Sequence, residues 1–240
     1  MTMTRADYFA GLRNSAAVVV SASPFALLFG ALAVKNGLSV GEAVLMSATL
    51  YAGASQMVGI ELFGKQVAPW LIVFSIFAVN FRHVLYSASI GRHFGGMRFW
   101  QKAVSFFFLV DPQYAAAESR VERGLPITFA WFIGMGTGIF VCWVFGTWIG
   151  ALFGGMITNP RALGVDFLLP IYFLGILLGF RTRSNFLPVV IAAALGSIVA
   201  FHLVGSPWHV SLGALFGIVV AVLLPPGDPA PVDAVVEPGR

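Results

Sequence analysis

The sequence predicts an all-α protein, a polytopic transmembrane helix bundle, and three observations lead to this prediction. Hydrophobic residues make up 58% of the 240 residues and charged residues only 10%, too few to solvate the surface of an ordinary soluble domain. Long runs contain no Asp, Glu, Lys or Arg, and they cover 16–34, 43–60, 66–81, 124–160 and 184–227. Stretches such as LIVFSIFAV are apolar on every side, whereas the strands of a transmembrane β-barrel would alternate in polarity.

Glycine, proline and charged residues divide the chain into eight hydrophobic segments. They lie at about 15–34, 42–62, 68–90, 103–117, 127–154, 165–180, 185–204 and 209–225. Because a membrane-spanning helix needs about 20 mostly apolar residues, we expect about six to eight membrane segments. Residues 1–227 are therefore predicted to form a single transmembrane domain, and the Pro-rich residues 228–240 a disordered C-terminal tail.

Two of these segments carry signals for a broken helix. Pro24 lies at the centre of the first segment, and Asp111-Pro112 interrupts the fourth. Proline removes a backbone donor, and the freed carbonyl is tolerated at membrane depth only where it faces protein or a watery cavity. Each broken segment is followed by two plain ones, so residues 15–90 and 103–180 predict a possible internal repeat. Matching broken helices in two halves of a chain are typical of a transporter's binding site.

The distribution of Lys and Arg gives a prediction for the topology. If all eight segments span from a cytoplasmic N-terminus, the positive charges are spread over both sides, against the expected cytoplasmic excess. If segments 15–34 and 103–117 instead enter and leave on the cytoplasmic side, only Lys65 and Arg161 remain outside. The charges therefore favour two re-entrant segments and six full spans. A fold built from inverted repeats would contradict this assignment.

Three polar residues stand together in the apolar stretch AVNFRHVLY, which covers residues 78–86. A charged side chain at mid-bilayer costs about 3 kcal/mol, so Arg82 and His83 are candidates for a functional site. In the alternative reading Arg82 anchors the end of its helix at the interface and His83 only packs. Asn80 adds an amide with four hydrogen-bonding positions, none of which lipid can satisfy.

The second segment offers a matching polar set in LYAGASQMVG, where Tyr51, Ser55 and Gln56 lie on a helix made thin by glycine. Gln56 is predicted either to line a cavity or to join helices by hydrogen bonds. Asp111 is the third candidate, because apolar residues precede it for two turns and Pro112 exposes the backbone beside it. Its alternative reading is a helix end at the interface.

Other classes of function lack their motifs. The four histidines, which are His83, His93, His202 and His209, have no metal-ligand spacing, and the motifs HExxH, GxSxG and the Walker loop are absent from the sequence. Cys142 is the only cysteine, so no disulfide forms within one chain. We predict no metal, no cofactor and no nucleic-acid partner, and we interpret the net charge of +4 as a signal of topology.

Four stretches resemble the AzlC family, the large subunit of bacterial branched-chain amino acid exporters. They are SPFALLFGALAVKNGLS, GEAVLMSATLYAGASQ, NFRHVLYSASI and FFFLVDPQYA, and the resemblance extends over about residues 10–225. It implies a multi-pass permease of the bacterial cell inner membrane that exports branched-chain or other small neutral amino acids, often with a small AzlD-like membrane subunit. The family commonly has Glu after the aspartate, whereas Pro112 stands here, so a coupling role for a carboxylate pair at this place does not carry over.

The resemblance, combined with the polar residues, gives a set of expected roles. The predicted substrate-binding residues are Gln56, Asn80, Arg82, Phe25 and Phe29, and the predicted ion-coupling residues are Asp111 and His83. The two amides would bind the backbone groups of the amino acid and Arg82 its carboxylate. Asp111 would pair with the ammonium group or carry a coupling proton, and the phenylalanines would accept a branched side chain. Alternating access around this site is the expected mechanism.

Two alternatives stay open at this point. The chain could be a non-transporting membrane scaffold subunit, or an intramembrane enzyme that uses His83 and Asp111 as a base pair. The glycine-rich strings GMGTG at 134–138 and GALFG at 213–217 could hold the partner subunit or pack only within the chain.

Overall fold

The computed structural model describes residues 4–64, 66–154, 171, 174, 175, 177–205 and 208–225. All of its regular elements within these residues are helices, which confirms the all-α class. The helices are α1 (Arg5–Asn14), α2 (Ala16–Lys35), α3 (Val40–Leu50), α4 (Gly53–Gly64), α5 (Pro69–Asn80), α6 (Arg82–Gly91), the 3-10 turn η1 (Arg92–Phe94), α7 (Phe99–Phe107), α8 (Asp111–Glu122), α9 (Phe129–Phe153), α11 (Phe186–Val204) and α12 (Trp208–Leu223).

Four helices in the described part of the chain are long and apolar enough to cross a membrane. They are Ala16–Lys35, Pro69–Phe94, Phe129–Phe153 and Phe186–Val204, and α3 and α12 are shorter apolar helices. The chain divides into two compact units, Met1–Ile176 and Leu177–Arg240. The predicted tail at 228–240 and most of the segment predicted at 165–180 lie outside the described residues.

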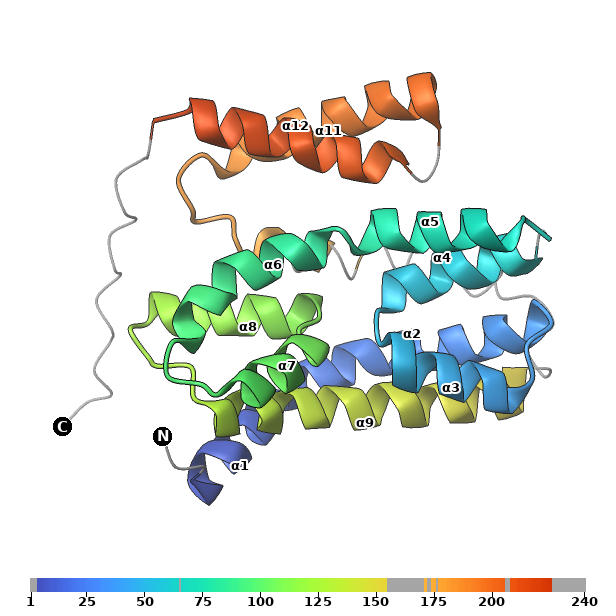
Figure 1. Ribbon diagram of the computed structural model, residues 1–240, viewed down its shortest axis with the longest axis horizontal. Coiled ribbons are helices and arrows are strands. Elements are labelled where there is room, and N and C mark those ends of the chain that lie inside the picture. The colour runs from blue at the N-terminus through green and yellow to red at the C-terminus, as the bar shows by residue number, and fades with distance from the viewer. Residues whose placement is uncertain are drawn as a thin grey trace. The chain divides into compact units, whose positions relative to one another are not determined.

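Helices α1 and α2 pack along α9 in the same direction, and glycines bring their backbones together (Figure 1). Gly11 lies against Trp131, and Gly30 lies further along against Thr147, so α1 and α2 run parallel to α9. A Cβ atom on Gly30 would collide with the Thr147 carbonyl, and one on Gly150 with the Leu27 carbonyl. The hydrophobic effect does not drive membrane helices together, because lipid is itself apolar. Close contact at these glycines therefore supplies the packing energy that holds α1 and α2 against α9.

The expected break at Pro24 is wrong, because α2 continues through it for 20 residues. Proline removes the hydrogen bond of its own nitrogen and crowds the carbonyl four residues earlier, and membrane helices tolerate this where neighbouring helices and side chains satisfy the freed backbone group. Pro24 removes the amide donor of the Val20 carbonyl; the carbonyl of the preceding residue, Val19, accepts from the Ser23 hydroxyl at 2.6 Å, and α9 packs along the helix. The predicted repeat of one broken and two plain segments therefore lacks its first broken member.

The second segment, expected as one helix over 42–62, is instead broken between α3 and α4. Tyr51 has a left-handed backbone with φ of 31° and ends α3. The chain then turns back, so that Gly64 at the end of α4 lies beside Asn36, just before α3 begins. Helices α3 and α4 form a hairpin whose two ends lie at one end of the unit (Figure 1).

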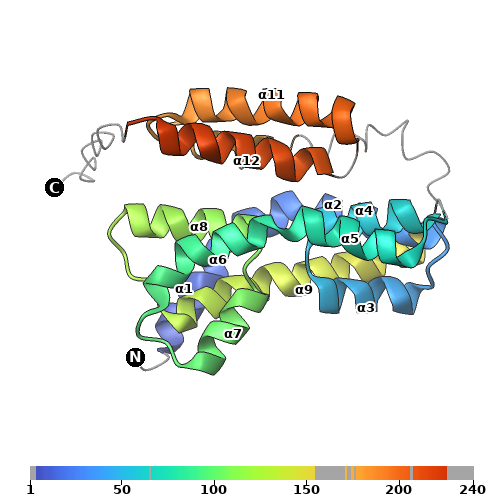
Figure 2. The ribbon, with the colours of Figure 1, turned by 45° about the horizontal axis from the view of Figure 1, so that its top comes forward.

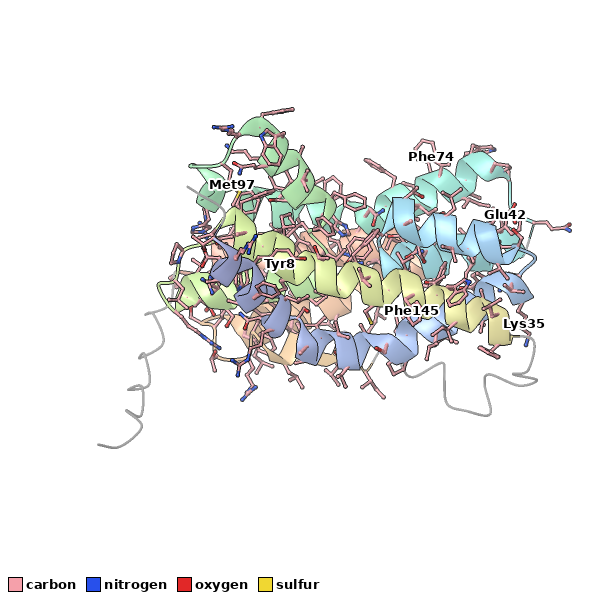
Figure 3. All side chains as sticks on the ribbon, turned by 90° about the horizontal axis from the view of Figure 1, so that it is seen from below. Tyr8, Lys35, Glu42, Phe74, Met97 and Phe145 are labelled. Atoms are coloured by element: carbon pink, nitrogen blue, oxygen red, sulfur yellow. The ribbon has the colours of Figure 1, made fainter. Side chains whose placement is uncertain are left out.

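The fourth segment is interrupted before Asp111-Pro112, as predicted. Helix α7 ends at Phe107, and α8 begins at Asp111 with Pro112 in its first turn, where a missing amide hydrogen costs no helical bond. Met97 before α7 and Val121 near the end of α8 line one surface hollow, so α7 and α8 form a second hairpin. It opens at the opposite end of the unit from the first (Figure 2). Lys35 and Glu42 mark one end and Met97 the other (Figure 3).

The third segment forms α5 and α6, with a bend at Phe81 between them. Arg82 therefore begins a new helix beside the bend and does not lie within a straight span. Helix α6 runs beside α8 in the same direction, since Arg82 faces Asp111 and Ser89 faces Glu118. The bend thus brings the polar stretch NFRH against the tip of the second hairpin, where α8 begins.

Both glycine-rich strings pack inside their own units. A Cβ atom on Gly136 would lie 2.8 Å from the Phe108 side chain, and one on Gly213 would lie 2.6 Å from the Cβ of Ser197. In the second unit, Gly213 lets α12 lie against α11, and the Asn185 amide donates to the Pro225 carbonyl at 2.9 Å. Between the two readings of these glycines, the structure supports packing within the chain.

Candidate functional site

A partly open cavity of about 40 Å³ lies where the two hairpins meet. The first hairpin contributes Tyr51, Gly53 and Ala54, the second contributes Val110, Asp111 and Pro112, and the remaining wall is Ala22, Phe25, Ile139 and Trp143. One water molecule needs about 10–15 Å³ of such space, so the cavity accommodates a few waters and no amino acid. A larger ligand requires the walls of this cavity to move apart.

Asp111 is the acidic residue of this cavity, and both of its carboxylate oxygens have partners on α6. The Arg82 guanidinium lies 3.1 Å from Oδ2, and the Tyr86 hydroxyl donates to Oδ1 at 2.9 Å. The side chain of Asp111 is 11% exposed and that of Arg82 is 21% exposed. Burial of an ion pair is tolerated only with good geometry and further hydrogen bonds, and Tyr86 supplies one of them.

The contact between α6 and α8 continues away from the cavity as a polar stripe. Tyr86 stacks on Tyr114 with ring centroids 4.2 Å apart, and the Ser89 hydroxyl donates to Glu118 at 2.5 Å. Asp111 and Glu118 are seven residues apart on one face of α8, and both are buried. Sequence reasoning missed Tyr86 and Glu118, although their spacing from Arg82 and Asp111 gives the signal.

Gln56 is fully buried in a closed ring of hydrogen bonds behind the cavity. Its amide oxygen accepts from the Trp143 indole nitrogen at 2.9 Å, and its amide nitrogen donates to the Ser47 hydroxyl at 3.0 Å. Ser47 bonds to Thr147 at 2.8 Å, and Thr147 donates to the Trp143 carbonyl at 2.9 Å. The ring joins α3, α4 and α9, so the amide of Gln56 holds helices together as well as an aromatic wall.

Asn80 and His83 belong to another network at the bend. The Ser55 hydroxyl donates to the Asn80 side-chain oxygen at 2.5 Å, which joins the first hairpin to α5. The Nδ1 atom of His83 lies 3.2 Å from the Asn80 carbonyl oxygen. In the part of the chain that the structure describes, no hydrogen bond joins His83 to Asp111.

Aromatic side chains close the cavity on two sides. Phe25 and Phe29 contact Trp143 with ring centroids 5.8 and 6.3 Å away, and Phe25 lines the cavity whereas Phe29 lies behind it. Between the hairpin tips, Tyr51 contacts Phe108 and packs edge-on against Phe140 of α9 with centroids 5.0 Å apart. These contacts keep the tips together in the described conformation.

The structure therefore separates the predicted site residues into groups. Asp111 and Phe25 line the cavity, and Arg82 reaches it through its ion pair with Asp111. Gln56 and Asn80 do not line it, and their substrate-binding roles stay predictions. Trp143 was missed, although a tryptophan and a threonine four residues apart place two hydrogen-bonding groups on one face of α9. Among the described residues, no group of three His, Cys, Asp or Glu is placed to hold a metal ion.

These features define a class: a multi-pass helical membrane protein with two helical hairpins whose tips meet at a cavity, and with a largely buried ion pair at the tip of the second hairpin. A family model described as AzlC protein matches residues 17–157, a range that includes both hairpins and α9. The chain is 31% identical over 223 residues to "Inner membrane protein YgaZ" of Escherichia coli K12, which covers 91% of each chain. It is also 31% identical over 195 residues to an "Uncharacterized membrane protein" of Archaeoglobus fulgidus, covering 80% of this chain and 84% of the relative.

The chain belongs to the AzlC family. The comparison with solved structures gave no match. The relatives and the four long apolar helices confirm a multi-pass protein of the inner membrane. The names of the relatives state no substrate.

Proposed function

We propose that this chain is a secondary transporter that exports branched-chain or other small neutral amino acids by alternating access. One observation carries the proposal, namely the buried pair of Arg82 and Asp111 at 3.1 Å beside an apolar cavity between two hairpin tips. Buried ionisable groups within a membrane protein mark substrate or ion pathways by default, because their burial is costly. Family membership supports a role related to transport.

The chemistry of the pair suits a zwitterion. A free amino acid carries a carboxylate and an ammonium group, so it can bind Arg82 with one and Asp111 with the other. One intramolecular ion pair is then exchanged for two intermolecular ones, with little net change in buried charge. The apolar wall formed by Phe25, Ile139 and Trp143 then takes the side chain of the substrate. A cationic amino acid would place an unpaired charge against this wall, which disfavours it.

Alternating access requires the cavity to open to one side and then to the other. At about 40 Å³ the described conformation is closed to an amino acid. We infer that both hairpins are re-entrant and that they enter from opposite faces, because α3–α4 opens at one end of the unit and α7–α8 at the other (Figures 1 and 2). Each hairpin is then a candidate gate for its own side. This arrangement replaces the expectation that 15–34 and 103–117 both enter from the cytoplasm.

The proposal includes a small AzlD-like membrane subunit only because the family resemblance implies one. The glycines that offered a second argument for it, Gly136 and Gly213, contact Phe108 and Ser197 of the same chain. For the intramembrane enzyme, no observation favours His83 as a base, because its ring contacts the Asn80 carbonyl and Asp111 is engaged by Arg82 and Tyr86.

The direct test uses purified protein in liposomes loaded with labelled valine. We expect valine efflux above that of protein-free liposomes, competition by leucine and isoleucine, and no competition by lysine. Protein reconstituted with and without a small AzlD-like membrane subunit distinguishes a need for that partner from a lack of activity. Absence of efflux in both preparations contradicts the proposed function.

Topology is tested separately by labelling single cysteines in a Cys142→Ser background. Figure 3 labels Lys35 at one end of the unit and Met97 at the other. A cysteine in place of Lys35, near the mouth of the first hairpin, and one in place of Arg98, which follows Met97 and precedes α7, should react from opposite faces of the membrane. Labelling of both from the cytoplasm would reinstate the same-side arrangement and contradict the inverted one.

A further inference from the structure

Trp143 forms one wall of the cavity, and packing fixes its ring from several sides. Phe29 stacks on it at 23° between the ring planes, and Phe25 packs at 45°. On the hairpin side, a Cβ atom on Gly53 would lie 2.8 Å from the Cη2 atom of the indole. Glycine at position 53 therefore lets the edge of the indole touch the backbone of the first hairpin, directly at the tip.

Hydrogen bonds also hold the indole of Trp143 in place, in addition to these packing contacts. The indole N–H donates to Gln56, and Gln56 is held in turn by Ser47, which bonds to Thr147 one turn after Trp143. Thr147 also donates to the Trp143 carbonyl, so this network of hydrogen bonds closes on α9. Gln56, Ser47 and Thr147 are all fully buried, so no solvent replaces a bond that is broken.

We propose that Trp143, positioned by Gln56, sets the upper size limit of the substrate's side chain; this rests on the proposed function and names the residue that determines its specificity. A side chain that enters the apolar part of the cavity must fit against the indole. The indole cannot swing aside without leaving a buried N–H and a buried amide oxygen unpaired. The wall is therefore rigid, and a rigid apolar wall discriminates by size, with one methylene group changing rates by about 10-fold or more.

The other lining groups are less suited to this role. Ala22, Ala54 and Gly53 carry little or no side chain, and Ile139 has no polar group that would fix its rotamer. Gln56 acts through Trp143, since it is fully buried and does not line the cavity. It is a positioning residue, and its role predicts altered selectivity in addition to any loss of stability.

The test compares efflux of alanine, valine, leucine and phenylalanine from liposomes containing single variants. Trp143→Phe shortens the wall, and we expect the efflux of phenylalanine relative to valine to rise by roughly tenfold. Gln56→Met keeps the length of the side chain and removes its hydrogen bonds, so it should shift the ratio in the same direction. Gln56→Glu restores an acceptor for the indole N–H and should keep a ratio close to that of the unchanged protein.

Gln113→Met is the matched control. Gln113 is also fully buried on a hairpin and donates to the Phe132 carbonyl at 2.7 Å, and its hydrogen bond does not belong to the network of Trp143, Gln56, Ser47 and Thr147. We expect this variant to lower thermal stability without changing the ratio of phenylalanine to valine. If Trp143→Phe does not fold, the Gln56→Met and Gln56→Glu pair decides the question.

The outcomes separate the two proposals. If the unchanged protein exports none of the four amino acids, the proposed function is wrong, and this proposal falls with it. If the unchanged protein exports them with a graded preference, but Trp143→Phe and Gln56→Met leave that preference as it was, the proposed function stands and the size limit lies elsewhere. An equal shift in Gln113→Met would also overturn the proposal, because a general loosening of the bundle would then account for it.

Discussion

The two hairpins have the same shape and are held in place by different chemistry. The first hairpin, α3–α4, is tied to α9 by neutral groups, with Gln56 bonded to Trp143 and Ser47 bonded to Thr147. The second hairpin, α7–α8, is tied to α6 by charge, with Asp111 paired to Arg82 and Glu118 accepting from Ser89. Both tips meet at the same cavity.

This difference assigns them different tasks. A neutral amide bonded on both sides inside a bundle offers little to a charged ligand, and breaking its bonds leaves buried polar atoms unpaired. An ion pair, in contrast, is exchanged readily for two pairs with a zwitterion, because each partner keeps an opposite charge. The first hairpin is therefore suited to hold a fixed wall, and the second to respond to the substrate.

The largest effect is expected from removing the charge of the second hairpin. Asp111→Asn keeps the shape of the side chain and leaves Arg82 without its counterion, and loss of one partner of a desolvated charge pair costs about 2–5 kcal/mol. We expect valine efflux to fall by at least about 30-fold while the protein remains in the membrane. Efflux at the level of the unchanged protein would show that transport does not need the charge of Asp111. The contrast between a neutral and a charged hairpin would then have no functional basis.

The next effect concerns the stability of the charged anchor. Arg82→Gln leaves Asp111 buried and uncompensated; because Arg82 is 21% exposed, we expect a loss of about 1–3 kcal/mol, below the value for a fully buried pair. The double variant Arg82→Gln with Asp111→Asn should recover most of this stability without recovering efflux. Thermal unfolding in detergent measures the stability, and additive losses in the double variant would show that the two side chains do not interact.

A third effect tests how the tip of the second hairpin packs. Gly136→Leu forces a side chain against Phe108, and overpacking of this kind costs about 1–3 kcal/mol. Gly41→Leu on the first hairpin is the control, because a Cβ atom there meets nothing within 4 Å. We expect the isolated chain to lose thermal stability only with Gly136→Leu. Release of a small subunit without loss of stability would instead indicate an intermolecular face.

Particular residues show how far the sequence determined the fold and site. Composition was sufficient for the membrane class, and Asp111-Pro112 marked its break correctly because the proline occupies the first turn of α8. Pro24 misled, since α2 tolerates it, whereas the break at Tyr51 carries no proline at all. Beside that break Trp143 fills the space next to Gly53, a contact between residues about 90 positions apart that no local pattern contains.

The smallest effect concerns the mouths of the hairpins, where the same contrast of charge recurs. Glu42 at the start of α3 accepts from the Ser39 amide at 2.7 Å and from its hydroxyl at 2.8 Å. At the start of α7 the corresponding acceptor is neutral, since the Arg98 amide donates to the Gln101 side-chain oxygen at 2.8 Å. Of these two helix caps, only the one at the first mouth contains an acceptor that titrates, the carboxylate of Glu42.

The hydrogen bonds from Ser39 hold the pKa of Glu42 below its ordinary value of 4.5. A lowered pKa means that this cap stabilises the folded state fully above pH 4.5 and that its contribution is lost as the pH falls through the lowered value. Glu42→Gln should thus reduce the melting temperature slightly at pH 7, by less than Gly136→Leu, and the difference should vanish in acid. Gln101→Ala at the second mouth should give a small difference that does not change with pH. A difference for Glu42→Gln that stays constant from pH 7 into acid would show that the carboxylate charge contributes nothing to the cap, and the two mouths would then be equivalent.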